Sequence, residues 1–430
     1  MKKIAKFLIV LGMIGQLSSC DYLDIVPDER AQESDTWKTE GAVRGYLYSC
    51  YGYLPANRTF GNSYWLAEEL TAVTKELFTT FKYGYYSPVS LGFTSNTWST
   101  IWNGIHQCYM FQESLKQVSN EYVTDEMKKQ YLAESNFLIA YYHFLSMRSY
   151  GPTMIIRSVI DLETPISGFP ERSSIDEVVA FINEKLDEAM SEGGLPTTWS
   201  GKDYGRATRL AALALKSRVY LYAASPLYNG NTEMYADFRS PLDGRQLIAQ
   251  EKSQAKWEIS ATQTKYAIDE VEKAKFHLYH DADAGEPSDA KPGLPNKAQR
   301  RLRYTNIDNQ TGNNPEIIWA DTRNDDYYGI QRRCPPRQTL GGKFAGISMT
   351  NCPTLQTIEA FYTKNGLPIN KDKTFDYDER YEYISAPENC DGNNYEDLVK
   401  YANFTPSSDK VMRLCTDREP RFYAWTTYHN

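Results

Sequence analysis

Apolar residues recur at intervals of three and four positions through most of the first 280 residues. Val43, Leu47, Tyr51 and Leu54 show this spacing after a polar start at 34–36. The spacing places these side chains on one face of an α-helix, so a helix is predicted here. The same pattern predicts further helices at about 98–118, 124–150, 174–189, 206–224 and 254–274. The predicted fold class is therefore all-α.

Capping signals and short connections suggest how these helices are organised. Ser174 and Glu177 match a capping box at the start of one helix. The connections 119–123 and 193–204 are short, so consecutive helices are expected to pair. The motif W-x-x-I-x-x-x-Y at 102–109 echoes the first helix of a tetratricopeptide repeat. Because the echo does not recur at a fixed period, the pattern indicates a degenerate array of helix pairs.

The pattern changes after residue 280. The segment 281–304 is rich in Pro, Gly, Lys and Arg and should form a loop, and 325–350 is also irregular. A short strand is predicted at 316–320, after the turn-forming residues 313–315, and one more helix at 354–362. Long loops held by a rigid scaffold often carry function, so these loops are candidates for a binding role.

The N-terminus has the features of an export signal. Three lysines among the first six residues precede the apolar run 7–15, which is too short to span a bilayer. The sequence Leu-Ser-Ser-Cys that ends at Cys20 resembles the lipobox of bacterial lipoproteins. We therefore predict that residues 1–19 are removed as a signal peptide and that Cys20 is the site of lipid attachment. An ordinary signal peptide with a chance cysteine is the alternative.

Charge and hydropathy narrow the possible partners. The chain has 47 basic and 55 acidic residues and a formal net charge of −8. Nucleic-acid binding needs clustered Lys and Arg, so no nucleic-acid partner is expected. No segment after the signal has the roughly eighteen consecutive apolar residues of a membrane helix, so the lipid is expected to be the anchor.

The 33 tyrosines suit a wet recognition surface, although many of them will pack in the core.

The sequence shows no catalytic, cofactor or metal motif. It lacks H-E-x-x-H, a P-loop, a G-x-G-x-x-G that opens a helix, and G-x-S-x-G. His106 and His143 fall inside predicted helices, where a packed or hydrogen-bonded role is favoured over catalysis. His277 and His280 are three residues apart but have no suitable partner nearby, so no metal is predicted. The many carboxylates leave a glycosidase-like acid–base pair open.

The cysteines after residue 20 show no C-x-x-C spacing. Cys50 and Cys108 lie on apolar helix stripes and are predicted to be buried thiols. Cys334 and Cys352 lie in the loop-rich region and could pair, but free thiols are favoured there because a chain of this size needs no covalent staple.

Several sequence blocks resemble one family in the same order along the chain. The stretch C-D-Y-L-D-I-V-P at 20–27 resembles the mature start of the SusD/RagB lipoproteins of Bacteroidetes, and A-E-S-N-F-L-I-A-Y-Y-H-F at 133–144 resembles their most distinctive helix. Further similar blocks lie at 102–105 with 111–113, 150–152, 205–208 leading to 221–224, 314–319, 353–366 and 418–423. Each block alone is weak, but their shared order across the chain is specific.

The resemblance implies a fold of tetratricopeptide-like helix pairs with long loops that carry the ligand site. It also implies a non-catalytic outer-membrane lipoprotein, exposed at the cell surface, that captures oligosaccharides or polysaccharides. Its partner would be a SusC-like TonB-dependent transporter, over which the protein acts as a lid. A peptide-binding role, as in the RagB branch, is the main alternative. A secreted glycosidase and a structural helical-repeat scaffold are less favoured.

The resemblance also bears on the extent of the domain. Residues 20–430 would form one SusD-like nutrient-binding domain. Family members usually continue well past the block that matches 418–423, so the C-terminal part of the family fold is expected to be missing. Exposed apolar surface would then be expected where that part normally packs.

The resemblance places the ligand loop between the first long helix and the helix that contains Trp102. That interval holds the ring-rich segment 78–88, in which Gly84 and Pro88 oppose a regular helix. Rings on a loop suit a saccharide, which offers apolar faces fringed with hydroxyls. The predicted ligand-binding residues are Phe81, Tyr83, Tyr85 and Tyr86, with Tyr327 and Tyr328 in a second patch. The rings could equally pack the loop onto the helices, and Trp319 is expected in the core.

Overall fold

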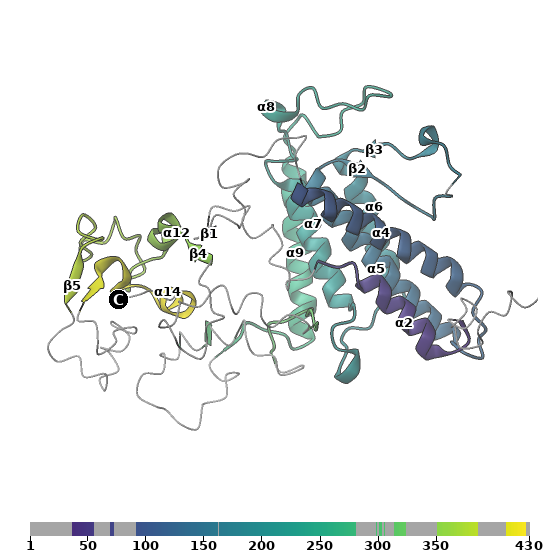
Figure 1. Ribbon diagram of the computed structural model, residues 1–430, viewed down its shortest axis with the longest axis horizontal. Helices are drawn as coiled ribbons and strands as arrows, with labels where there is room; N and C mark the ends of the chain where they lie inside the picture. Colours follow the sequence, from purple (N-terminus) through teal and green to yellow (C-terminus); the bar gives the residue numbers. More distant parts are fainter. Residues whose placement is uncertain are drawn as a thin grey trace, which may run out of the picture.

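A bundle of long helices makes up the larger part of the structure (Figure 1). This computed structural model describes residues 37–55, 69–72, 92–161, 163–280, 298, 301–302, 305, 314–323, 351–385 and 410–426. The bundle consists of α2 (Glu40–Tyr51), α4 (Gly92–Leu115), α5 (Asp125–Tyr150), α6 (Ile175–Ala189), α7 (Arg209–Ala224) and α9 (Gln254–Lys273). Each helix packs on the next in this order. The predicted helix-rich array is therefore confirmed.

Side-chain caps explain where these helices begin. Threonine side chains cap α2, α5 and α7 by accepting a hydrogen bond from a backbone N–H of the first turn. Ser174 and Glu177 form the predicted capping box at the start of α6. Each such cap satisfies an N–H that the helix leaves unpaired and is worth about 1 kcal/mol. Because Thr208 is the cap of α7, that helix begins at Arg209, three residues later than predicted.

α5 runs through the centre of the core. From 133 to 147 every side chain of this helix is buried except that of Tyr141, which is half-buried. α2, α4, α6 and α7 all contact α5, which accounts for burial around its whole circumference. The approach of α4 is especially close, because a Cβ on Gly104 would lie only 2.7 Å from the Tyr142 ring.

His143 shows how a polar side chain is accommodated in this core. Its Nε2 accepts a hydrogen bond from the Ile156 N–H at 3.3 Å, so Nδ1 carries the proton and donates to the Ile139 carbonyl at 2.8 Å. Burial lowers the pKa of His143 to about 4, which keeps the ring neutral. The packed role predicted for His143 is confirmed, whereas His106 is exposed.

The described cysteines are free thiols. Cys50 and Cys108 are buried, as predicted, and burial raises the pKa of Cys108. Cys352 is also free; it lies in β4 (Asn351–Pro353), which pairs antiparallel with β1 (Leu70–Ala72). Cys334 lies outside the described residues.

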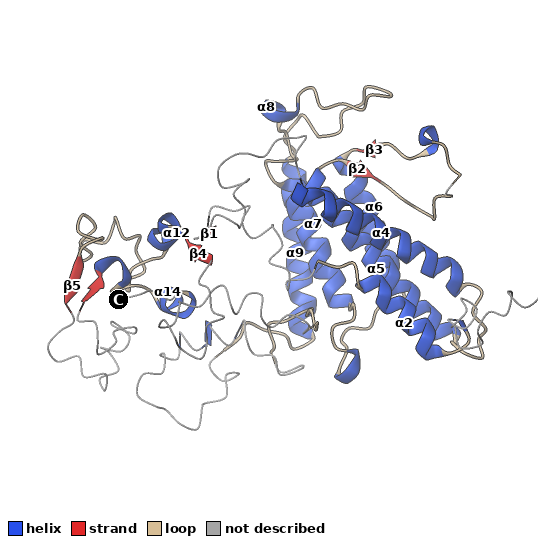
Figure 2. Ribbon diagram, in the orientation of Figure 1, coloured by secondary structure: helices blue, strands red, loops and turns tan. Residues whose placement is uncertain are grey.

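Short strands and helical turns occupy the connections (Figure 2). β2 (Thr153–Met154) pairs antiparallel with β3 (Arg172–Ser173), and β5 (Tyr383–Ser385) pairs antiparallel with β6 (Lys410–Met412). Single turns form η4 (Ile166–Gly168), η5 (Gly201–Asp203) and α8 (Thr232–Tyr235). The β2–β3 pair and the single turns join helices of the bundle, whereas β5 and β6 follow the bundle and place Val411 in a separate core cluster.

The strand predicted at 316–320 is wrong, because this segment forms turns. The Asn314 side chain accepts a hydrogen bond from the Glu316 N–H at 3.1 Å, and the Asn314 carbonyl accepts one from the Ile317 N–H at 3.3 Å. Such local bonds compete with the ladder of a strand. The indole N–H of Trp319 also donates to the Gly205 carbonyl at 2.8 Å, which ties the turn to the connection before α7.

A smaller, loop-rich part follows the helices. It contains α12 (Leu355–Ala360), η6 (Arg413–Cys415) and α14 (Pro420–Trp425), with Phe422 and Tyr423 in its core. Arg418 is only 2 % exposed, and its guanidinium donates to the carbonyls of Leu414, Ile358 and Phe361. α12 is shorter than the predicted helix at 354–362 because the backbone is already extended at Phe361.

Candidate functional site

A cavity of about 710 Å³ lies among four segments that are distant in the sequence. Its walls come from the ends of α2 and α5, from the connection that precedes α7, and from 319–323. This volume falls within the range of about 300–1,000 Å³ that is usual for small-molecule sites. The cavity is therefore large enough for one or a few sugar or amino-acid residues.

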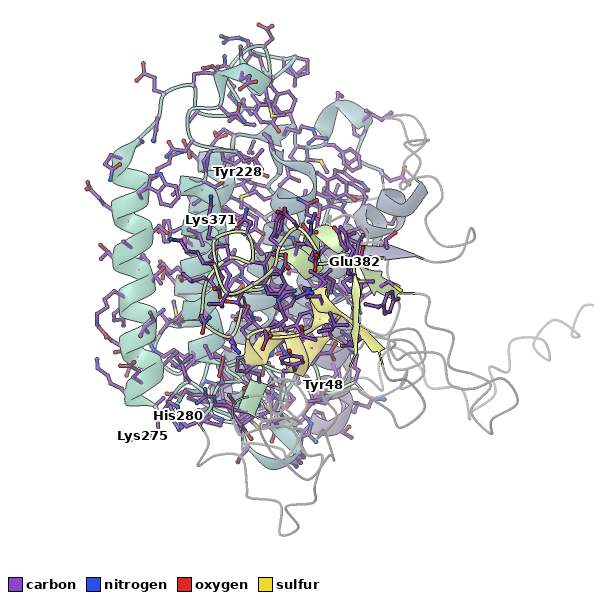
Figure 3. All side chains as sticks on the ribbon, turned by 90° about the vertical axis from the view of Figure 1, so that its left-hand side faces the viewer. Tyr48, Tyr228, Lys275, His280, Lys371 and Glu382 are labelled. Atoms are coloured by element: carbon purple, nitrogen blue, oxygen red, sulfur yellow. The ribbon has the colours of Figure 1, made fainter. Side chains whose placement is uncertain are left out.

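Helical spacing explains how two of the walls are built. On α5, Tyr141, Leu145 and Arg148 are spaced by four and three residues, so they share the face that borders the cavity. On α2, Tyr48 and Tyr51 are three residues apart and also share a face. Tyr48 is 40 % exposed, so part of its ring is accessible to solvent (labelled in Figure 3). Both helices thus contribute their C-terminal turns.

Aromatic rings form much of the lining. They belong to Tyr48, Tyr51, Tyr141, Tyr204 and Trp319. The Trp319 ring meets the Phe137 and Tyr141 rings edge-on, at centroid distances of 5.1 and 5.4 Å. Since Phe137 is fully buried, Trp319 packs on the core, as predicted, but its other side faces the cavity, which was not predicted.

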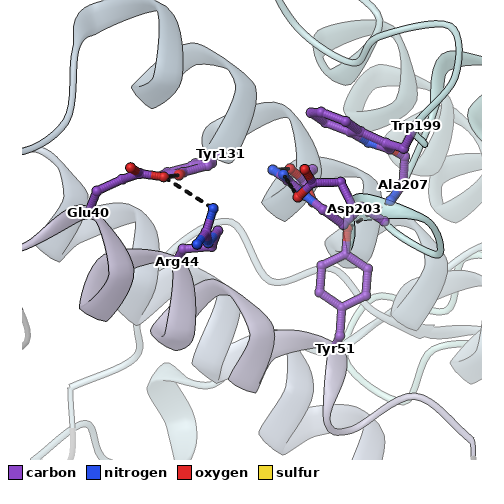
Figure 4. Close-up of polar contacts among 9 residues, drawn as sticks. Glu40, Arg44, Tyr51, Tyr131, Trp199, Asp203 and Ala207 are labelled. Carbon is purple, nitrogen blue, oxygen red and sulfur yellow. Dashed lines mark hydrogen bonds and ion pairs between the residues drawn. The ribbon is translucent and has the colours of Figure 1, made fainter. Parts of the chain in front are cut away.

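A buried polar network holds the cavity floor together (Figure 4). Glu134 of α5 accepts hydrogen bonds from Arg206, with Nε at 3.2 Å, and from the Tyr51 hydroxyl at 2.6 Å. Arg206 also pairs with Asp203 at 2.8 Å, and the Tyr51 oxygen accepts from the Ala207 N–H at 2.9 Å. The network therefore joins α2, α5 and the connection before α7 at one point.

The electrostatics of this network follow from its burial. The Glu134 side chain is fully buried and that of Arg206 is 9 % exposed. Burial raises the pKa of Glu134, and the hydrogen bonds from Arg206 and Tyr51 counter this rise. Glu134 and Asp203 together raise the pKa of Arg206 against the effect of burial. The guanidinium also lies 4.1 Å from the Trp199 ring centroid, within cation–π range.

Close backbone contacts fix the segment 319–323 against the rest of the site. Gly205 has a φ of +98°, and a Cβ there would lie 2.8 Å from Thr322 Cγ2, so glycine is required. Arg323 pairs with Asp321 and donates to the carbonyls of Leu54 and Pro55 at 3.0 and 2.9 Å. The end of α2 is thereby bound to a segment about 270 residues later in the chain.

The predicted site residues do not fall in the described part of the chain. Cys20, Phe81, Tyr83, Tyr85, Tyr86, Tyr327 and Tyr328 all lie outside it. Sequence reasoning missed the cavity, although three blocks used for the family resemblance contribute to it through Tyr141, Arg206 and Trp319. Those blocks indicated the family, but they did not show where the cavity lies.

Metal binding and membrane spanning find no support in the described residues. Nowhere among them do three or more His, Cys, Asp or Glu side chains gather as a metal site. The His277 and His280 rings stack at a centroid distance of 5.2 Å, and both are exposed. None of the helices in this part of the chain combines the length and apolar character of a membrane span.

Two family models match separate parts of the chain. A model described as "Starch-binding associating with outer membrane" matches residues 21–221, and one described as "SusD family" matches residues 315–430. Together they cover about three quarters of the sequence. A comparison with curated proteins found no match.

Solved structures share the fold. BT4246 is 29% identical, with a TM-score of 0.70, over 90% of this chain and 64% of that one. A SusD-like protein (BF3747) from Bacteroides fragilis is 20% identical, with a TM-score of 0.61, over 92% of this chain and 61% of that one. The chain thus spans less than two thirds of the length of these structures. The matches confirm the predicted tetratricopeptide-like helical fold.

Proposed function

The chain belongs to the SusD family, and we propose that it captures saccharides at the bacterial cell surface for uptake. The observation that carries this proposal is the ring-lined cavity. Tyr48, Tyr141, Tyr204 and Trp319 offer apolar faces for sugar rings, while charged side chains at the same site offer partners for hydroxyls. The family model described as starch-binding supports the same ligand class.

Binding at such a site should be weak for a single short ligand. An open cavity with a few stacking rings is expected to give a dissociation constant in the range of mM to μM, or about −4 to −8 kcal/mol. Polymers would be retained more strongly, because repeated units rebind at high effective concentration. Weak, repeated binding suits a protein that must also release what it captures.

We propose that the protein binds without catalysis. Hydrolysis of a glycosidic bond usually needs two carboxylates about 5–10 Å apart on either side of the bond. Among the described residues that line the cavity, Asp321 is the sole carboxylate, and it already pairs with Arg323. Glycan incubated with the protein should therefore be recovered at its original length; shortened products would favour the glycosidase alternative.

The remaining parts of the proposal concern the membrane. We propose that residues 1–19 are a signal peptide, that Cys20 carries the lipid, and that residues 20–430 form one SusD-like domain on the outer membrane. A SusC-like TonB-dependent transporter would be the partner that receives the ligand. Growth with an alkyne-tagged fatty acid should label the wild-type chain, and Cys20→Ala should remove the label. Label that survives this change would refute Cys20 as the lipid site.

Two tyrosine variants test the cavity as the binding site. Tyr48→Ala and Tyr204→Ala each remove a ring from the lining, and each should weaken glycan retention by about three- to tenfold, the worth of one aromatic contact. Tyr266→Ala is the matched control, because Tyr266 is 43 % exposed and lies on α9, away from the lining. The assay is retardation in native gels that contain single polysaccharides.

The outcomes separate the possible readings. Weaker retention in both cavity variants, with Tyr266→Ala unchanged, supports saccharide capture at the cavity. Unchanged retention in both would assign binding to another surface. A wild-type chain that ignores every polysaccharide but binds a peptide mixture would instead favour the peptide-binding branch.

A further inference from the structure

The charges around the cavity differ from those of the chain as a whole. The full sequence carries a net charge of −8. In contrast, the cations among the described lining residues outnumber the carboxylate: Arg148, Lys202, Arg206 and Arg323 against Asp321. A local excess of positive charge on an acidic protein calls for a physical explanation.

Two of these cations already have structural partners. Arg206 is bound by Glu134 and Asp203, and Arg323 is bound by Asp321. Their charges are largely compensated, and their geometry is fixed by the contacts that build the cavity. These two cations therefore hold the site together. The excess positive charge of the site comes from Arg148 and Lys202.

Arg148 and Lys202 have no such compensation. Both are exposed, and neither forms an ion pair with any residue that the structure describes. The Arg148 guanidinium lies 5.9 Å from the Phe144 ring centroid, at the edge of cation–π range. Some cations elsewhere on the bundle do have partners: Lys216 pairs with Asp187 at 2.5 Å, and Lys256 with Asp176 at 2.5 Å.

Both side chains come from well-fixed backbone. Arg148 lies in the last turn of α5, on the same face as Tyr141. Lys202 lies in η5, next to Asp203, which the buried Arg206 holds at 2.8 Å. Two cations that stand beside stacking rings, on separate walls of one cavity, provide a charged counterpart for a sugar that bears an anion.

We propose that the cavity selects saccharides that carry an anionic group, either a carboxylate or a sulfate ester. This proposal rests on the proposed function, because it names the class of saccharide that the same site takes. Stacking on the rings would hold the sugar face, and Arg148 and Lys202 would bind the anion. Two exposed ion pairs are together worth about tenfold in affinity, and salt should weaken them.

Polymers with the charge masked provide the test. The wild-type chain is run in native gels that contain polygalacturonate or its methyl ester, which differ only in the free carboxylate. Dextran sulfate and dextran form the second pair and isolate the sulfate ester. At low salt, at least one anionic polymer should be retained about tenfold more strongly than its neutral counterpart, and 0.5 M NaCl should remove most of that preference.

Variants then assign the preference to the cavity. Arg148→Gln combined with Lys202→Gln should bring retention of the anionic polymer down to that of the neutral one. Arg218→Gln and Lys371→Gln are the controls, because both residues are exposed cations outside the cavity lining, and Lys371 lies in the smaller part (Figure 3). They should leave the preference unchanged.

Three results would overturn the proposal. The first is equal retention of the charged and neutral member of each pair; the second is a preference that survives in the double variant. In either case, if retention still depends on Tyr48, the proposal of saccharide capture stands and only the proposed selectivity for an anionic group is refuted. The third is that the wild-type chain binds none of these polymers and none of the wider polysaccharide panel, which removes the proposed function as well.

Discussion

Replacing Arg206 with Met should lower the free energy of unfolding by several kcal/mol. Arg206 is the partner of Glu134, whose side chain is fully buried. Removing one member of a buried ion pair typically costs about 3–5 kcal/mol, because the other charge is left without compensation in a medium of low polarity. Met keeps most of the apolar contact with the Trp199 ring, so the change acts mainly on charge.

The pH dependence distinguishes this cause from simple loss of packing. Burial already raises the pKa of Glu134, and without the guanidinium that pKa must rise further. The folded variant then keeps a proton that the unfolded chain releases above about pH 4.3. Because the unfolded state binds fewer protons, the free energy of unfolding of Arg206→Met falls as pH rises, relative to wild type.

Urea unfolding at pH 5 and pH 8 measures both effects. The deficit of Arg206→Met against wild type should be larger at pH 8 than at pH 5. Arg44→Met is the control, since Arg44 pairs with Glu40 at 3.3 Å on the surface nearby (Figure 4), and its loss should cost no more than about 0.5 kcal/mol. A deficit below 1 kcal/mol for Arg206→Met, or one that is the same at both pH values, would refute the reasoning.

Three further predictions concern the core, the cavity wall and the predicted loop. Burial lowers the pKa of His143 to about 4, so below pH 6.5 the unfolded chain binds a proton there that the folded chain does not. This one group should lower the free energy of unfolding of wild type by about 3 kcal/mol from pH 6.5 to 4. Urea unfolding of His143→Gln across that range should show a shallower decline, and an equal slope would contradict the assignment. Gly205→Ala forces an alanine to a φ of +98° and should cost about 1–3 kcal/mol while weakening glycan retention; an unchanged melting temperature would show that the strain is relieved. Binding by the loop rings is a separate prediction from the sequence, under which replacing Tyr83, Tyr85 and Tyr86 with Ala would abolish glycan binding without loss of helical circular dichroism. Unchanged affinity would exclude the loop and leave the cavity as the site.

The helices could be predicted because their signals are local. The capping box of Ser174 and Glu177 and the apolar spacing of α2 depend on residues within a few turns of each other. The turn at 316–320 was predicted wrongly because a bond from Trp319 to Gly205, 114 residues away, helps to decide its shape. A run of apolar residues there fits a strand equally well when that partner is unknown.

The cavity could not be predicted for the same physical reason. Tyr51 bonds to Ala207 across 156 residues, and Glu134 to Arg206 across 72. Nothing in the spacing of these residues shows that they meet. The family resemblance directed attention to rings in the loops at 81–86 and 327–328, which lie outside the described residues, and those site residues stay predictions.

The bond between Arg323 and the end of α2 has a consequence for the order of folding. Successive helices of the bundle contact their neighbours, so they can assemble step by step as the chain is synthesised. The walls of the cavity cannot close in this way, because Arg323 must return to Leu54 across 269 residues. Glycan binding should therefore appear late in folding. A chain that ends before residue 319 should be helical but should not bind glycans.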